Sequence, residues 1–363
     1  MKTNVVRKRQ VLYGVASLLA GGCASLGPRA VKQTHYEYNT AIAKITDEQV
    51  LLNLVRLKYR DMPYFLEVGN VSESRKFTTR IGPSGSKFGI IGNANKHEIG
   101  LLAYSEIFQN PTIQYTPLKG EDFTKRLMTP IPLTLVLGLM QAGWKTKRVF
   151  NICVERLNQL DNASSASGPT PNKKPNNQSF AEAVDLIDTL HKQNRLLLGL
   201  APDNGNDFAM KFTSSDAQSQ RLKSILGLDA NTSEFRFDPN FLNVNATGPT
   251  VRTRSLMEVL FYLSHAVDVP QEDIDAGLVT VTKDEQGNPF DWSKSLSGEW
   301  IAIRHAEQQP QNAFVSIAYK GTWFYIADDD LNAKSTFMFL NYLLNLLSGN
   351  PKSVAPVLTI SAN

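Results

Sequence analysis

The five histidines are the residues best suited to metal binding or acid–base chemistry, and their spacing supports neither. They are His35, His97, His191, His265 and His305. No two stand four residues apart, the spacing that places two imidazoles on one zinc ion. The run Gly82-Pro-Ser-Gly-Ser86 lacks the last glycine of a serine nucleophile turn, and no phosphate loop, dinucleotide fingerprint or EF-hand occurs in the sequence. We therefore predict no catalytic residue, no cofactor and no metal.

An acidic cluster, Asp328-Asp329-Asp330, lies between an expected strand and an expected helix. Carboxylates in such a cluster can bind a divalent cation. At a helix start they also accept hydrogen bonds from free N–H groups and complement the helix dipole. We favour the capping role, and the cation site stays open as the alternative.

The N-terminus has the three-part layout of a secretory signal. Four basic residues and no acid precede an apolar stretch at residues 11–20, and small residues then lead to Cys23. Ten apolar residues span only about 15 Å as a helix, about half of a bilayer core, so no permanent transmembrane helix is expected here. Residues 1–22 are predicted to be a cleaved signal peptide.

The run Leu19-Ala20-Gly21-Gly22-Cys23 resembles the bacterial lipobox. In that motif the cysteine thiol receives a diacylglyceryl group, and two or more acyl chains, such as palmitate, hold a protein stably on a bilayer. The resemblance implies lipidation of Cys23. Ala24 after it implies sorting to the outer membrane, facing the periplasm, if the source is Gram-negative. An ordinary signal with a chance cysteine and a twin-arginine route stay open as alternatives.

The charge balance argues against one class of partner. The chain has 38 basic and 34 acidic residues. Lys2, Arg7, Lys8 and Arg9 lie in the signal, and subtracting these four leaves 34 basic residues against 34 acidic ones. A formally neutral body without later blocks of like charge gives no reason to expect nucleic acid as a partner.

Cys153 is the only other cysteine, and it lies in an apolar run at residues 149–154 that is typical of a buried strand. If Cys23 is acylated, Cys153 has no intramolecular disulfide partner. A buried cysteine behaves as a small hydrophobic residue. We interpret Cys153 as a core thiol, with a catalytic nucleophile as the alternative.

The first half of the body, residues 41–161, follows a polar, aperiodic tether at residues 23–40. Thr46-Asp-Glu-Gln49 has the pattern of a capping box and predicts a helix at 46–60. Alternating residues predict paired strands at 64–71 and 76–81, a loop or hairpin at 82–100, and a strand at 112–118. Further helices are predicted at 121–128 and, buried on nearly every side, at 130–143.

Residues 162–178 have no aromatic or branched aliphatic side chain to bury. This composition predicts a disordered linker or a long exposed loop, whose replacement would alter stability little. It would separate the first half from a second half at residues 179–363, and the recurrence of strand, helix and strand suggests that the two halves are similar.

The second half has three further capping boxes, Ser179 with Glu182, Ser215 with Gln218, and Ser255 with Glu258. They predict helices at 180–194, 216–226 and 256–267. Strands are expected at 196–200, 208–212, 234–237, 250–254, 300–304, 313–320, 322–326 and 357–360, and a helix at 331–347. Short antiparallel strands mixed with amphipathic helices indicate an α+β fold.

Two segments resemble a group of uncharacterised bacterial lipoproteins. One is Asp47-Glu-Gln-Val-Leu-Leu-Asn-Leu-Val-Arg-Leu-Lys-Tyr-Arg-Asp61 with Pro63-Tyr-Phe-Leu-Glu-Val68, and the other is Trp323-Phe-Tyr-Ile-Ala-Asp-Asp-Asp-Leu331 with Lys334-Ser-Thr-Phe337. Similar segments sit near the two ends of the mature chain in that group. The resemblance implies location more than activity.

The sequence thus predicts a lipid-anchored envelope protein that binds another envelope protein or helps to assemble a complex, without catalysis. One alternative is a periplasmic hydrolase acting on peptidoglycan or another glycan, in which aromatic residues such as Trp292 or Trp323 would stack on sugars. Another is a solute- or glycan-binding module. A concave cleft with converging carboxylates would favour the hydrolase.

Overall fold

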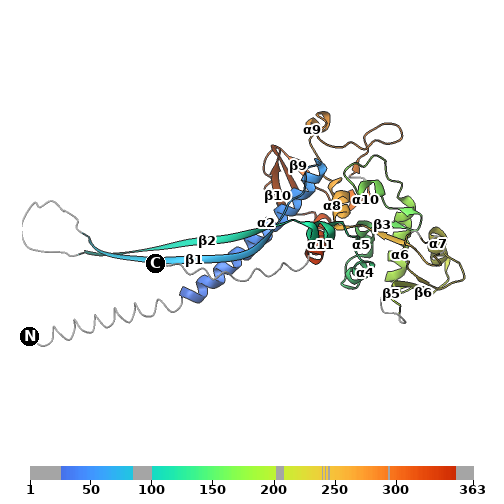
Figure 1. Ribbon diagram of the computed structural model, residues 1–363, viewed down its shortest axis with the longest axis horizontal. Coiled ribbons are helices and arrows are strands. Elements are labelled where there is room, and N and C mark those ends of the chain that lie inside the picture. The colour runs from blue at the N-terminus through green and yellow to red at the C-terminus, as the bar shows by residue number, and fades with distance from the viewer. Residues whose placement is uncertain are drawn as a thin grey trace, which may run out of the picture. The chain divides into compact units, whose positions relative to one another are not determined.

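The structure is a computed structural model that describes residues 26–84, 100–201, 208–238, 240–241, 243, 246–292 and 295–348. Helices and short antiparallel strands confirm the predicted α+β class (Figure 1). The described residues divide into a larger unit, within 26–64 and 119–348, which we call the compact unit, and a second unit of residues 65–84 and 100–118. The division therefore does not fall at residues 162–178, where we predicted two halves to meet.

Helix α2, Leu26–Lys58, begins well before the predicted position. The Oγ1 of Thr46 donates to the carbonyl of Ile42 at 2.9 Å, a bond made by a threonine inside a continuous helix. The predicted capping box at Thr46 is therefore wrong, and the described part of the predicted tether is helical. The apolar face of the helix is buried through Val50, Leu51, Leu54, Val55 and Leu57.

The end of α2 has the hydrogen bonds of a Schellman motif. Arg60 takes a left-handed conformation, with φ 60°, and its N–H donates to the carbonyl of Leu57. The N–H of Asp61 donates to the carbonyl of Arg56 at 2.8 Å. These bonds end the helix ahead of Pro63, as the sequence predicted.

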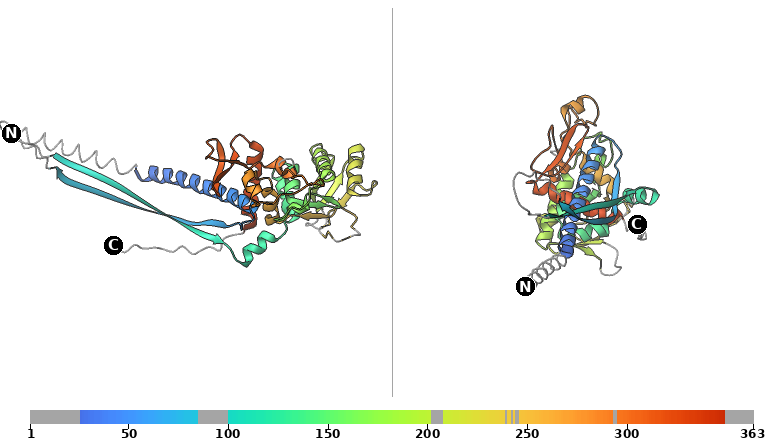
Figure 2. Two further views of the ribbon diagram at one scale, coloured as in Figure 1. Left: turned by 90° about the horizontal axis from the view of Figure 1, so that it is seen from above. Right: turned by 90° about the vertical axis from the view of Figure 1, so that its left-hand side faces the viewer.

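The second unit contains one long antiparallel ribbon of two strands, β1 (Phe65–Ser84) and β2 (Gly100–Leu118). Nineteen residue pairs join them, interrupted by one irregularity between Val68 and Asn70. In the left-hand view of Figure 2 the two strands cross, which is the twist expected of a two-stranded ribbon. The strands predicted at 64–71 and 76–81 therefore do not pair with each other. Apart from Tyr64, both stretches belong to the single strand β1. Residues 85–99, which connect the two strands in the sequence, lie outside the described residues.

Three helices follow, α3 (Glu121–Met128), α4 (Leu133–Gln141) and α5 (Thr146–Cys153). The first two confirm predicted helices, although α4 buries only Val136, Leu137 and Leu139, so it is not covered on nearly every side. Helix α5 replaces most of the strand predicted at 149–154. Every residue from Arg148 to Cys153 is buried, and a helix covered on all sides shows no periodicity that distinguishes it from a buried strand.

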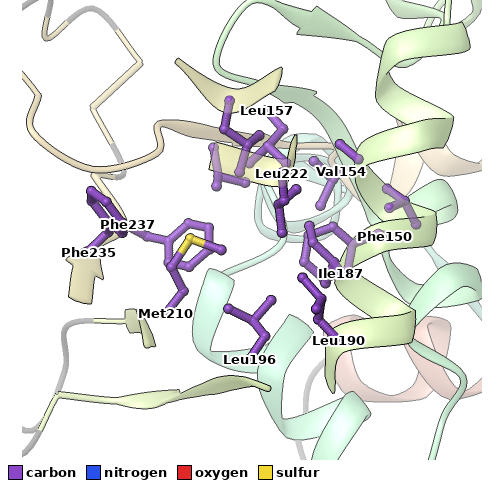
Figure 3. Close-up of a cluster of buried hydrophobic side chains, with 14 of the residues drawn as sticks. Phe150, Val154, Leu157, Ile187, Leu190, Leu196, Met210, Leu222, Phe235 and Phe237 are labelled. Carbon is purple, nitrogen blue, oxygen red and sulfur yellow. The ribbon is translucent and has the colours of Figure 1, made fainter. Parts of the chain in front are cut away.

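The middle of the chain builds a three-stranded antiparallel sheet against two helices. Strands β5 (Leu196–Leu200), β6 (Phe208–Phe212) and β7 (Glu234–Arg236) confirm predicted strands. Helices α6 (Gln178–Lys192) and α7 (Ala217–Leu226) pack against each other. Their apolar side chains form one core with those of α5 and strand β3 (Val154–Leu157), as Figure 3 shows for Phe150, Ile187, Met210 and Leu222.

Only one of the three capping boxes predicted in this half forms. Ser255 accepts the Glu258 N–H while the Glu258 side chain accepts the Ser255 N–H, at the start of α8 (Leu256–Ser264). Helix α6 begins before Ser179, and α7 is capped by Asp216 instead of Ser215. The predictions at Ser179 and Ser215 are therefore wrong.

Strand β3 is the middle of a sheet with β4 (Leu160–Asp161) and β8 (Val251–Thr253). Between β4 and α6, residues 162–177 are irregular, as predicted, and include the short helix η1 (Ser164–Ala166), whereas Gln178 already belongs to α6. They are neither disordered nor wholly exposed, since Asn162, Ala163 and Ala166 are buried. Small and polar side chains can be buried when their hydrogen bonds are satisfied, which a count of apolar bulk does not detect.

The C-terminal part adds α9 (Gln271–Asp275), α10 (Leu296–Trp300), a sheet in the order β10-β11-β9, and α11 (Leu331–Ser348). The strands are β9 (Arg304–Ala306), β10 (Ala313–Tyr319) and β11 (Thr322–Ala327). Strands β10 and β11 and helix α11 confirm predictions. The strand predicted at 300–304 is wrong because α10 ends at Trp300, and the strand predicted at 357–360 lies outside the described residues.

Residues 47–61 and 323–341, far apart in the sequence, lie against each other in the compact unit. The Asn341 side-chain amide of α11 donates to the carboxylate of Asp47 in α2 at 2.9 Å. The rings of Tyr59 and Phe324 meet edge to face at 6.2 Å. Helix α2 therefore packs on strand β10 of the C-terminal sheet, so segments far apart in the sequence share one core.

Candidate functional site

The residue predicted to carry lipid, Cys23, lies outside the described residues, so its lipidation stays a prediction. Among the helices that the structure describes, none is long and apolar enough to cross a membrane.

Cys153 ends helix α5 and is fully buried. Burial raises the pKa of its thiol to about 12, and the nearby charge of Arg254 offsets only part of that rise. The thiol is therefore protonated at neutral pH and unsuited to nucleophilic attack. The interpretation of Cys153 as a core residue is confirmed.

The acidic cluster at the start of α11 caps the helix. The Asp330 carboxylate accepts the N–H of Ala333 at 2.9 Å, and Asp328 pairs with the Lys334 ammonium at 2.6 Å. Within the described ranges, no group of three or more His, Cys, Asp or Glu side chains is placed to hold a metal ion. The capping role is thus confirmed for Asp330.

One pocket of the compact unit, of about 660 Å³, lies beside the C-terminal end of α8. Its walls are largely apolar, with Val267, Val279, Trp292 and Ile303 among them. Lys58, from the end of α2, also lines it. A mostly apolar concavity with a few polar groups is the usual form of a small-molecule site.

Lys58 is engaged with the protein itself. Its ammonium donates to the carbonyl of His265 at 3.1 Å, which caps the C-terminal end of α8 with a positive charge. Burial lowers the pKa of Lys58 to about 8, and the charge of Asp268 partly opposes this. The pocket therefore contains an amine that already has a structural role.

His265, beside Lys58, holds the irregular segment in place. Its Nε2 lies 3.1 Å from the carbonyl of Ala166 and 3.2 Å from that of Gly168, so this nitrogen carries the proton. Its ring lies 5.2 Å from that of Trp292. Burial, helped by the charge of Lys58, lowers the pKa of His265 to about 3.

We expect this depressed pKa to make the fold sensitive to mild acid. The unfolded chain binds a proton on His265 below about pH 6.5, whereas the folded chain does so only near pH 3, so stability falls as the pH falls between these values. The folded-to-unfolded ratio should drop by up to about tenfold per pH unit from this residue alone. Urea melts at pH 7, 6 and 5 measure the slope.

The matched variants for the acid experiment are His265→Gln, which cannot titrate, and His305→Gln, which changes a histidine paired with Asp268 near the surface. His265→Gln should be less stable at pH 7 but should lose less stability on acidification. An equal acid slope in His265→Gln and the unmodified chain would contradict the assignment.

The β1–β2 ribbon is the second candidate site. It offers a partner the backbone N–H and C=O groups of its strand edges instead of a pocket. Its sheet contains two strands only, whereas every other sheet that the structure describes contains three. At about 3.4 Å per residue the 20 residues of β1 extend roughly 65 Å. In an antiparallel pair, alternate residues turn their N–H and C=O groups away from the partner strand, so each long strand has an outer edge able to pair with a further strand.

No protein-family model matches this chain, and no curated protein or solved structure is significantly similar to it. The site residues must therefore be judged on their own geometry.

Arg254, Lys58 and the full length of the ribbon were not identified from the sequence as important. Tyr104, Ile107 and Phe108, residue types that are common in strands, were the available signal for β2. Neither Lys58 nor Arg254 carried a local signal of burial.

Proposed function

We propose that this protein is a lipid-anchored component of the cell envelope that binds another protein or helps to assemble a complex, and that the β1–β2 ribbon is its binding element. The proposal places the lipid on Cys23, in the outer membrane facing the periplasm if the source is Gram-negative. The observation that carries it is the two-stranded ribbon with nineteen residue pairs.

The physical reason is the poor stability of such a ribbon alone. An isolated two-stranded hairpin is at best marginally stable in water, and a long exposed strand edge invites pairing with other chains. Addition of a strand satisfies the free backbone groups of the edge and is a recurrent way for proteins to recognise one another. A ribbon of this length is therefore better suited to binding than to catalysis.

Shortening the ribbon tests this function. In the variant, residues 75–109 are replaced by Asn-Gly, a pair that favours the tight turn of a two-residue hairpin. The register pairs Ser74 with Asn110, so the shortened strands would still meet in their present alignment. We expect the full chain, extracted from membranes in mild detergent, to migrate as a complex, and the variant to migrate as an isolated chain.

The thermal midpoint of the compact unit serves as the control, because its described residues form a unit separate from the two strands of the ribbon. An unchanged midpoint shows that the variant lost binding and not its fold. A complex of unchanged size in the shortened variant would contradict the proposed function.

A further inference from the structure

The ribbon has two outer edges of nearly equal length, one on β1 with 20 residues and one on β2 with 19. A single strand from another protein would cover one edge and leave the other exposed. A second copy of the same chain supplies a β1 edge and a β2 edge at once. Since β1 and β2 run antiparallel, the β2 edge of one ribbon and the β1 edge of the next also meet antiparallel when the ribbons point the same way.

Proline positions show which parts of the edges can pair. Proline has no N–H, so within a sheet it is tolerated where that group would face away from the paired strand. Pro111 and Pro117 remove N–H donors from β2 near its last residue, Leu118. Pro83 removes one from β1 near its last residue, Ser84. Residues 70–82 of β1 and 100–110 of β2 have no proline, and the register sets most of these two stretches opposite each other.

Charge favours one pairing of copies over the others. Residues 70–84 contain Arg75, Lys76 and Arg80 against the single acid Glu73, whereas residues 100–114 contain one acid, Glu106, and no base. Pairing β1 with β1 of another copy would bring two positively charged strands together, and like charges on adjacent strands are destabilising. Pairing β1 with β2 brings opposite net charges together.

We propose that the ribbons of several copies of this chain join edge to edge, with residues 70–82 of one copy pairing with residues 100–110 of the next. This rests on the proposed function and names its partner as a second copy. Such a contact uses different surfaces on the two copies, so it generates a ring if it closes and a row if it does not. Closure leaves no exposed edge, which removes the liability of a long unpaired strand.

Two differently tagged copies, expressed together and extracted in mild detergent, test the partner. Capture of the first tag should recover the second, and shortening both ribbons at residues 75–109 should reduce that recovery at least tenfold. Recovery that does not depend on the ribbon would overturn the inference. If the full chain forms a ribbon-dependent complex that lacks the second tag, the inference fails while the proposed function stands.

Cysteine cross-linking tests the arrangement. One population carries Thr78→Cys or Thr79→Cys in β1, which covers both faces of the strand, and the other carries Ser105→Cys or Gln109→Cys in β2. Under mild oxidation, mixed populations should form disulfide-linked dimers, and neither population alone should do so. Cys153 is buried and should not interfere. Dimers from the β1 population alone, or no dimers from any mixture, would overturn the head-to-tail pairing.

Discussion

Replacing Arg254 with methionine should cost about 3 to 5 kcal/mol of the free energy of unfolding, the range seen when one partner of a buried charged interaction is removed. Arg254 is completely buried. Its guanidinium donates to the carbonyls of Asn151, Ile152 and Val154 at 3.0 to 3.1 Å, and to that of Asn162. The first two carbonyls belong to the last turn of α5, where no intrahelical N–H remains to satisfy them.

Methionine fills much of the same volume but donates nothing. The carbonyls of Ile152 and Asn162 would lose the guanidinium donor. Those of Asn151 and Val154 would keep only the bond from the Asn162 side-chain amide. Urea denaturation of the unmodified chain and the variant measures the difference. Arg254→Lys should recover part of the loss, because an ammonium reaches fewer acceptors than a guanidinium fork. The control is Arg221→Met, which removes an exposed pair with Glu182 and should leave stability nearly unchanged. A similar small loss for Arg254→Met would show that the buried network contributes little.

Replacing residues 162–178 with a Gly/Ser segment of equal length should cost about 3 kcal/mol or more, the opposite of the small effect expected from composition. The Asn162 side-chain amide donates to the carbonyls of Asn151 and Val154 at 2.9 and 2.7 Å, and both bonds would be lost. Buried side chains, Ala163 and Pro171 among them, would also be lost. Added glycines further increase the entropy of the unfolded chain.

The matched control is a Gly/Ser replacement of residues 172–176 only. These residues are exposed or half-buried, so the shorter replacement should change the thermal midpoint little. The full replacement should lower the midpoint clearly and broaden or abolish the transition. Equal midpoints for the two variants would restore the interpretation of residues 162–178 as a linker.

Patterns within a few residues were sufficient to predict much of the secondary structure. The strands at Leu196–Leu200 and Phe208–Phe212 and the helix at Glu121–Met128 lie where alternation and helical spacing predicted them. The capping box of Ser255 and Glu258 forms because both of its bonds join neighbouring residues. Such features depend on the types and spacing of neighbouring residues, which can be read directly from the sequence.

The sequence did not show which of several similar capping patterns would form a helix cap. Ser179 and Ser215 have the same capping pattern as Ser255, yet Asp216 caps α7 in place of Ser215, with its carboxylate held by Arg195. Thr46 also has the pattern, but the helix runs through it. A cap is used only where the chain must begin a helix, and packing against other elements decides that.

The tertiary structure alone decided which polar groups are buried. Arg254 is the last residue of a predicted strand and resembles a surface residue in sequence, but it reaches carbonyls between 92 and 103 residues earlier in the chain. His265 and the carbonyls of Ala166 and Gly168 meet in the same way. Burial of a charged or polar group depends on whether distant donors and acceptors converge on it, and no pattern of spacing along the chain records that convergence.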